Sequence, residues 1–311
     1  MSRGCEDGQV AADYVLNPML APSPPLAWLN GALVPLRDLQ VSVDDVGFRQ
    51  GVIAVERMRT YERRVAAFEA HIVRWRRTLE ALSLGVSFDL EHLRDRVTRL
   101  LDANSDWLTQ SHECGVVMLA TPGVFSGGTA EHQCTEILHL MPLDLAKIRQ
   151  QRATGQPLFI TDVEQPAGKC WPRDIKVRCR LHYYLADQQA RAHHPAAVGL
   201  LIDQDGTVTE SSVANIAIVR GSRIVAPPID QVLPGITQEL VKQACAEVGL
   251  AWRYERLWPA EIREAEEVWL MGTDGGLWFA NRVDGIAIHG EQPGPCYAHV
   301  LPAFDRLVRT V

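Results

Sequence analysis

The feature that most constrains the fold is a repeated change of hydrophobic period along the chain. Short apolar runs bounded by turn residues are mixed with longer segments in which apolar residues recur every three or four positions. The pairs Asn30-Gly31, Asp205-Gly206 and Gly221-Ser222 separate such short runs and predict hairpins. Because hairpins and helices mix without strict strand–helix–strand alternation, we predict an α+β fold.

The helical period is clearest in three segments. Phe68, Ile72, Trp75, Leu79 and Leu82 form one stripe, and the segments 89–101 and 237–248 show the same spacing. A hairpin is predicted over 28–34. Strands are predicted at 52–58, 115–120, 135–140, 158–160, 198–202, 216–219, 224–225 and 267–271, with the last of these as the final strand.

The chain length indicates two domains. The chain has 311 residues, which exceeds one typical domain. Four prolines within 17–25 predict an extended N-terminal arm over 1–25. The polar segment 147–156 lacks apolar periodicity and is predicted to be the interdomain linker. We therefore expect a small α+β domain at 26–146 and a large one at 157–311.

Composition excludes several classes of function. The formal net charge is −7 and no basic stripe is present, which argues against nucleic-acid binding. No apolar run approaches the roughly 20 residues that a membrane span needs. The seven cysteines are odd in number, scattered and free of C-x-x-C pairs, so neither a metal site nor a disulfide framework is predicted. With no apolar signal-peptide core near Met1, we expect a cytoplasmic protein.

Three features in a fixed order suggest pyridoxal-phosphate chemistry. Lys176 lies between an extended stretch and a helical one, Glu210 follows a hairpin turn, and Gly235-Ile236-Thr237 precedes an amphipathic helix. The cofactor needs an amine for a Schiff base, an acid partner for its ring nitrogen and donors for its phosphate. Taken singly, each feature also fits a structural role: a surface lysine, a solvated strand end and an ordinary capped turn.

The same order of motifs resembles a known family. The motifs are Leu29-Asn30-Gly31, Asp44-Asp45-Val46-Gly47-Phe48-Arg49-Gln50-Gly51 ending in Glu56, His71-Ile72-Val73-Arg74, Ile175-Lys176, Asp205-Gly206-Thr207-Val208-Thr209-Glu210-Ser211-Ser212 with Asn215, Leu233-Pro234-Gly235-Ile236-Thr237 and Gly272-Thr273. From about Trp28 onward the chain resembles the class IV, fold-type IV pyridoxal-phosphate enzymes. That group includes branched-chain aminotransferases, D-amino acid aminotransferases and aminodeoxychorismate lyases.

The resemblance implies a fold and a set of roles. Each of two domains would hold a mixed or antiparallel sheet or barrel with flanking helices, and the protein would be a homodimer. Lys176 would form the Schiff base and shuttle the proton, and Glu210 would pair with the ring nitrogen. The remaining cofactor contacts would be Arg74, Gly235, Ile236, Thr237 and Thr273 around the phosphate, Leu233 on one ring face, and Asn215 as a hydrogen-bonding support.

The substrate side departs from the family pattern. Phe48, Glu56, Gly272 and Asp274 are expected there, but Val55 replaces the usual aromatic residue before the glutamate. Asp274 stands where many members have a small apolar residue, and would either repel a substrate carboxylate or favour a cationic group. No lysine or arginine lies between Arg99 and Lys147, where relatives often hold a carboxylate with basic residues.

We therefore expect an aminotransferase that moves the amino group of an L-amino acid, branched-chain-like or unusual, to a 2-oxo acid through Lys176. Two alternatives stay open. One is an aminodeoxychorismate-lyase-like β-elimination that releases pyruvate, and the other is a catalytically degenerate cofactor-binding paralogue.

Overall fold

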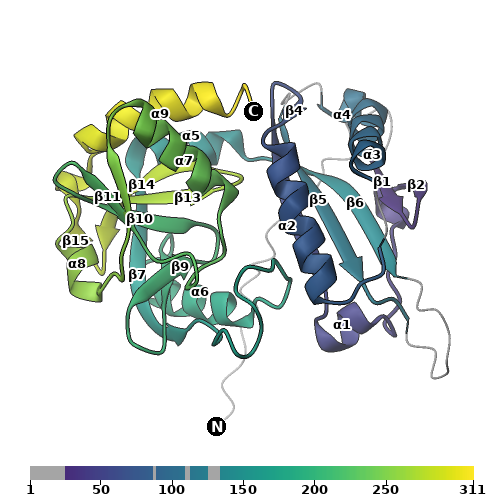
Figure 1. Ribbon diagram of the computed structural model, residues 1–311, viewed down its shortest axis with the longest axis horizontal. Coiled ribbons are helices and arrows are strands. Elements are labelled where there is room, and N and C mark those ends of the chain that lie inside the picture. Colours follow the sequence, from purple (N-terminus) through teal and green to yellow (C-terminus); the bar gives the residue numbers. More distant parts are fainter. Residues whose placement is uncertain (1–24, 87–88, 109–112, 125–133) are drawn as a thin grey trace, which may run out of the picture.

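The computed structural model describes residues 25–86, 89–108, 113–124 and 134–311 (Figure 1). The predicted N-terminal arm, apart from Pro25, lies outside the described residues. No helix in the described part of the chain is both long enough and apolar enough to cross a membrane.

The first half of the described chain forms an antiparallel sheet in the order β2-β1-β6-β5-β3-β4. Helices cover one of its faces (Figure 1). The strands are β1 (Leu26–Leu29), β2 (Ala32–Pro35), β3 (Ala54–Tyr61), β4 (Arg64–Val65), β5 (Cys114–Thr121) and β6 (Thr135–Pro142). The helices are the 3-10 helix η1 (Leu36–Asp38), α1 (Val46–Gln50), α2 (Phe68–Ala81), α3 (Leu90–Ala103) and α4 (Ser105–Leu108).

The helical stripe predicted from the sequence is the core-facing side of α2. Phe68, Ile72, Trp75 and Leu79 are all buried and pack in one cluster with the strands of this sheet. The predicted hairpin is also confirmed, because Asn30 and Gly31 both have positive φ angles, 49° and 84°, as the tight turn between β1 and β2 requires.

The second half forms a larger mixed sheet in the order β12-β11-β10-β13-β14-β7-β8-β9. An additional pairing of β9 with β10, at Glu210 opposite Asn215, closes the strands from β10 round to β9 into a barrel. The strands are β7 (Gln156–Glu164), β8 (Val198–Ile202), β9 (Val208–Ser211), β10 (Asn215–Arg220), β11 (Arg223–Ala226), β12 (Ala251–Tyr254), β13 (Glu267–Gly272), β14 (Gly276–Val283) and β15 (Ile286–Ala287), which pairs with β14.

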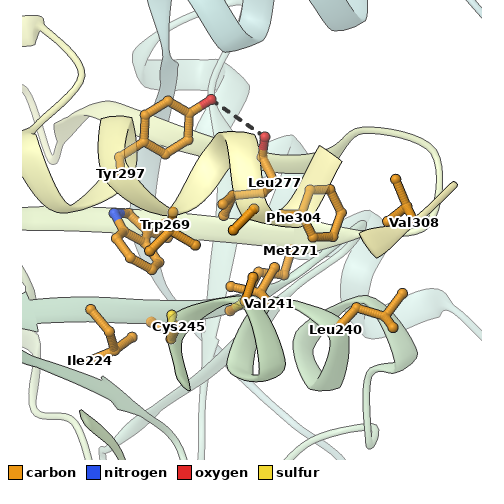
Figure 2. Packing of buried hydrophobic residues seen from close by; sticks show 14 of the residues in the cluster. Ile224, Leu240, Val241, Cys245, Trp269, Met271, Leu277, Tyr297, Phe304 and Val308 are labelled. Carbon is orange, nitrogen blue, oxygen red and sulfur yellow. Dashed lines mark hydrogen bonds between the residues drawn. The ribbon is translucent and has the colours of Figure 1, made fainter. Parts of the chain in front are cut away.

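Helices flank this sheet as the α+β prediction requires. They are α5 (Leu145–Thr154), α6 (Leu181–His193), α7 (Ile236–Glu247), α8 (Pro259–Arg263), the 3-10 helix η2 (His289–Glu291) and α9 (Pro295–Leu307). Side chains of α7 and α9 pack on β13 and β14, where Trp269 and Phe304 lie in one apolar cluster (Figure 2). The predicted fold class is confirmed.

Two sequence expectations differ from the structure. The segment predicted as a linker at 147–156 contains most of α5, a helix with no buried residue and therefore no apolar stripe to detect. Asp144 caps its first turn, and Arg152 pairs with Asp305 at 3.0 Å. The helix lies between the last strand of one sheet and the first of the other, and the domain boundaries themselves stay a prediction.

The second difference is that the strand at 267–271 is not the last. β14 follows it and pairs with both β13 and β7 in the middle of the large sheet. Its first five residues, Gly276 to Ala280, are all buried. A strand buried on both faces shows no alternation of apolar and polar residues, so the sequence pattern does not indicate β14.

Replacing Phe304 with alanine should destabilise the protein strongly. Phe304 is fully buried on α9, so Phe304→Ala should lower the free energy of unfolding by about 3–5 kcal/mol through lost burial and a residual cavity. The matched control is Phe48→Ala, because Phe48 is 72% exposed and its loss should cost less than about 0.5 kcal/mol. Urea denaturation of both variants measures the difference, and equal effects would contradict this account of the core.

Candidate active site

A cavity of about 890 Å³ lies where the two sheets meet, and both halves of the chain line it. Helix α2 stands between the sheets (Figure 1), and its side chains reach the large half through Arg74 and Thr78. The cavity gathers eleven of the thirteen residues expected at the site: Arg74, Lys176, Glu210, Asn215, Leu233, Gly235, Ile236, Thr237, Gly272, Thr273 and Asp274.

Lys176 is held in the cavity wall by its own backbone. Its N–H donates to Thr78 Oγ1 at 3.1 Å, and its carbonyl accepts from Val55 N at 3.0 Å. The next residue, Val177, forms a β-bridge with Ala54 of β3. The segment before α6 is therefore fastened to the small sheet, and the position of the Lys176 amine is set by elements distant in sequence.

Burial lowers the pKa of the Lys176 amine to about 8, and the nearby Arg74 charge adds to this effect. Glu56 acts in the opposite direction, since a negative charge stabilises the ammonium form. A lysine with this pKa carries a substantial neutral fraction near neutral pH, whereas an exposed lysine is almost fully protonated. The neutral amine is the form that attacks a carbonyl carbon.

Arg74 is fixed by a buried carboxylate. Its guanidinium donates to both oxygens of Glu56, from Nη2 at 2.7 Å and from Nε at 3.0 Å. His71 Nδ1 also lies 2.9 Å from Glu56 Oε1. This double contact holds the pKa of the Glu56 carboxyl well below its usual range in spite of its burial. The third nitrogen, Nη1, donates to the Pro234 carbonyl at 3.0 Å, which sets Arg74 beside the start of α7.

The start of α7 offers free amide donors. Its N-cap is Gly235, which has no side chain to cap the helix. A Cβ on this residue would lie 1.9 Å from Asn215 Oδ1, so only glycine fits here. Because the first amides of a helix have no intrahelical partner, Ile236 and Thr237 present N–H groups to the cavity next to Arg74. Backbone donors, a hydroxyl and a guanidinium together suit a phosphate group.

Glu210 lies in a dense set of donors at the barrel closure. Its Oε1 accepts from Tyr183 Oη at 2.6 Å and from Gln165 Nε2 at 2.9 Å. Its Oε2 accepts from Asn215 Nδ2 at 3.1 Å and from Leu233 N at 3.2 Å. Burial raises the pKa of Glu210, while these hydrogen bonds and Lys176 favour its carboxylate form.

Tyr183 and Gln165 contact Glu210 but were not expected at the site from the sequence. Tyr183 is in the first turn of α6, and Gln165 follows the end of β7. Neither belongs to a motif with a fixed spacing from Glu210, and the residues are 27 and 45 positions away from it. The one sequence signal for Tyr183 is its position in the helix that follows Lys176, where a phenol can face the site.

The turn between β13 and β14 forms another wall of the cavity. A Cβ on Gly272 would lie 2.5 Å from the Val213 carbonyl, so the end of β13 closely approaches the segment between β9 and β10. Thr273 and Asp274 line the cavity beside it. Asp274 is paired with Arg57 of β3, Oδ1 to Nε, at 2.5 Å.

Two residues expected on the substrate side lie outside the cavity. Glu56 is fully buried beneath Arg74, because a buried guanidinium needs a counter-charge, and it acts as a positioning residue there. Phe48 projects from α1 and is 72% exposed. The residues that line the cavity from this side are Val55 and Arg57 on β3, with Arg178 after Lys176.

Similarity to known proteins shows the family of this chain. The model of the amino-transferase class IV family matches residues 54–283, so the chain belongs to that family. The D-alanine aminotransferase of Bacillus licheniformis is 24% identical over 285 residues, which cover 90% of this chain and 95% of that protein.

Solved structures share the fold. The branched-chain amino acid aminotransferase of Escherichia coli superimposes with a TM-score of 0.84 at 22% identity, covering 92% of this chain and 95% of that one. A second branched-chain enzyme, from T.th. and complexed with N-(5'-phosphopyridoxyl)-L-glutamate, gives a TM-score of 0.82, also at 22% identity and with coverage of 92% and 95%.

The protein is therefore a class IV aminotransferase, and enzymes of this class use pyridoxal phosphate. The residues present suit this cofactor. The start of α7 has no side-chain cap on its first amides, Arg74 supplies a fixed positive charge, Glu210 is a buried acid and Lys176 is an amine with a lowered pKa.

Charge changes next to Lys176 should shift its reactivity in opposite directions. Arg74→Met removes a positive charge and should move the Lys176 pKa up from about 8, whereas Glu56→Gln removes a negative charge and should move it down. The neutral form of an amine is the nucleophile. The rate at which cofactor-free protein binds added pyridoxal phosphate should therefore rise with pH around the pKa of Lys176.

The pH midpoint of capture is measured from the absorbance of bound cofactor after mixing. Arg94→Met, which removes an exposed arginine of α3, is the matched control and should leave the midpoint unchanged. Shifts of the same sign in Arg74→Met and Glu56→Gln would refute the electrostatic explanation.

Proposed function

We propose that the protein transfers the amino group of an L-amino acid, branched-chain-like or unusual, to a 2-oxo acid, with Lys176 as the covalent anchor of the cofactor and the base. The observation that carries this proposal is a lysine whose pKa is lowered to about 8, in the wall of a cavity that also holds a buried acid and a helix start. A surface lysine on a basic stretch would have none of these surroundings.

Lys176 would do two things. Its neutral amine would hold the cofactor covalently until a substrate amine replaces it, and the released amine would then take the proton from the substrate α-carbon. When bound, pyridoxal phosphate supplies a carbonyl carbon for amines and a ring that accepts the electrons of the broken C–H bond. A pKa near 8 suits this alternation, because the amine can both accept and release a proton near neutral pH.

Glu210 would keep the ring nitrogen protonated. The carboxylate is buried and has Asn215, Gln165, Tyr183 and the Leu233 amide as fixed donors. These contacts orient the carboxylate and favour its charged form, so it can stabilise positive charge on the nitrogen.

The cofactor phosphate would be bound by Arg74 and the start of α7. Arg74, the Ile236 and Thr237 amides, the Thr237 hydroxyl and Thr273 line one region, with Leu233 and Asn215 nearby. Because Arg74 is already fixed by Glu56, little side-chain entropy is lost when an anion binds.

Support for the substrate class comes from the relatives. The E. coli and T.th. structures are branched-chain amino acid aminotransferases, and the latter is complexed with an adduct of L-glutamate. The curated relatives also include a D-alanine aminotransferase, so both enantiomers belong in the test.

The proposal is tested with half-reactions. Purified protein loaded with the cofactor is mixed with a panel of L- and D-amino acids, and the conversion to the pyridoxamine form is followed by absorbance. Lys176→Ala should lose the absorbance band of bound pyridoxal phosphate and slow amino transfer by about a thousandfold. Lys242→Ala, an exposed lysine of α7 paired with Glu239, is the matched control and should behave as the unmodified protein does.

The outcomes separate the alternatives. Conversion that depends on Lys176 supports the aminotransferase. Pyruvate release without a 2-oxo acid would identify the lyase instead, and cofactor binding without any conversion would identify a degenerate paralogue.

We also propose that the protein works as a homodimer. Helix α6 exposes the large apolar side chains of Leu181, Tyr184 and Leu185, with 66%, 60% and 45% of their surface accessible. Contiguous exposed apolar side chains suit a subunit contact. Light scattering should give twice the mass of one chain, and Tyr184→Glu should reduce it to one; a monomer in the unmodified protein would overturn this proposal.

A further inference from the structure

Three arginines gather at the side of the cavity that the cofactor contacts leave open. Arg57 comes from β3, while Arg178 and Arg180 follow Lys176 in sequence. The sequence has no lysine or arginine between Arg99 and Lys147, where relatives often hold a carboxylate with basic residues. Other elements supply the positive charge that lines this cavity.

Arg178 has no carboxylate paired with it among the residues that the structure describes. Burial, Arg180 and Arg57 lower the pKa of Arg178, and Asp274 is the negative group that acts against them. Positive charge therefore exceeds negative charge at this wall, which favours an anion over the cationic side chain that Asp274 alone suggested.

The carboxylate of Asp274 lies in this positively charged region. Its carboxylate pairs with Arg57, yet 44% of the Asp274 side chain is exposed. Arg57 is mostly buried, with 18% of its side chain exposed, so it keeps its position if the Asp274 side chain turns toward water and another carboxylate takes its place. The backbone of the turn is held separately, since the Asp274 carbonyl accepts a hydrogen bond from Arg59. The side chain can thus move without loss of the turn.

Ser212 provides a second, independent indication of a ligand. It is only 6% exposed, and its hydroxyl has no hydrogen-bond partner in the described part of the chain. Its carbonyl accepts from the Arg180 guanidinium, which fixes this segment in the cavity wall. A buried hydroxyl without a partner costs free energy, and a bound carboxylate oxygen would remove that cost.

We propose that Arg57, Arg178 and Ser212 form an anion subsite for the second carboxylate of a dicarboxylic substrate, with the Asp274 side chain as its displaceable internal occupant. The inference rests on the proposed function in one respect, namely that one of the two substrates of amino transfer enters this cavity. It assigns specificity to residues outside the cofactor contacts.

Binding can be measured without any reaction. Glutarate carries two carboxylates and neither an amino nor an oxo group, so calorimetry with cofactor-loaded protein measures the subsite alone. Arg178→Met should weaken glutarate binding about tenfold, the effect of losing one charge-assisted hydrogen bond. Asp274→Asn should strengthen binding, because it removes the competing carboxylate. Arg220→Met, an exposed arginine of β10 outside the cavity, is the matched control and should bind as the unmodified protein does.

Kinetics give a second measurement. The pair 2-oxoglutarate and 2-oxopentanoate differ in the distal carboxylate. Arg178→Met should raise KM for 2-oxoglutarate about tenfold and leave kcat and the KM for 2-oxopentanoate nearly unchanged. A purely structural role of Arg178 would change both substrates alike.

The failures of the two proposals are distinguishable. The subsite proposal is overturned if Arg178→Met leaves glutarate binding unchanged or if Asp274→Asn does not strengthen it. Either result leaves the proposed amino transfer intact. Absence of amino transfer overturns the proposed function, and glutarate binding that depends on Arg178 then still supports the subsite.

Discussion

The pairing of β9 with β10 is the contact on which the site depends, because it closes the large sheet into a barrel. At this closure Glu210 lies opposite Asn215, and the Asn215 amide links Glu210 to the Leu233 carbonyl just before α7. The acid, the helix start and the β13–β14 turn are thus brought to one end of a rigid scaffold. A functional group on such a scaffold loses little entropy when it binds a ligand.

Charge interactions within the first half of the chain and between the two halves position the other charged residues of the site. Charged residues reach the cavity region from distant parts of the chain, and each has a defined partner or effect. Glu56 holds Arg74, Arg74 lowers the pKa of Lys176, and Asp274 pairs with Arg57. Because the interior strengthens electrostatic interactions, a single substitution in this set changes the electrostatic surroundings of its neighbours.

Much of the fold followed from periodicity. The α2 stripe and the Asn30-Gly31 turn were predictable because they depend on local pattern and local backbone preference. Helix α5 and strand β14 were missed for the same physical reason: one has no buried face, and the other is buried on both. Arg152 of α5 pairs with Asp305, and β14 pairs with its neighbouring strands, and contacts of these kinds leave no period in the sequence.

The sequence by itself determined the class of chemistry, because Lys176, Glu210, Arg74 and the glycine-led start of α7 are recognisable by order and type. Only the tertiary structure decided their surroundings. It buried Glu56 beneath Arg74 and brought Tyr183 and Gln165 to Glu210. It also set Arg57 and Arg178 in the cavity wall, although the segment between Arg99 and Lys147 has no basic residue. The reason is that burial, pKa and charge balance depend on distances between elements, and residues far apart in the chain carry no mark of the partners they will meet.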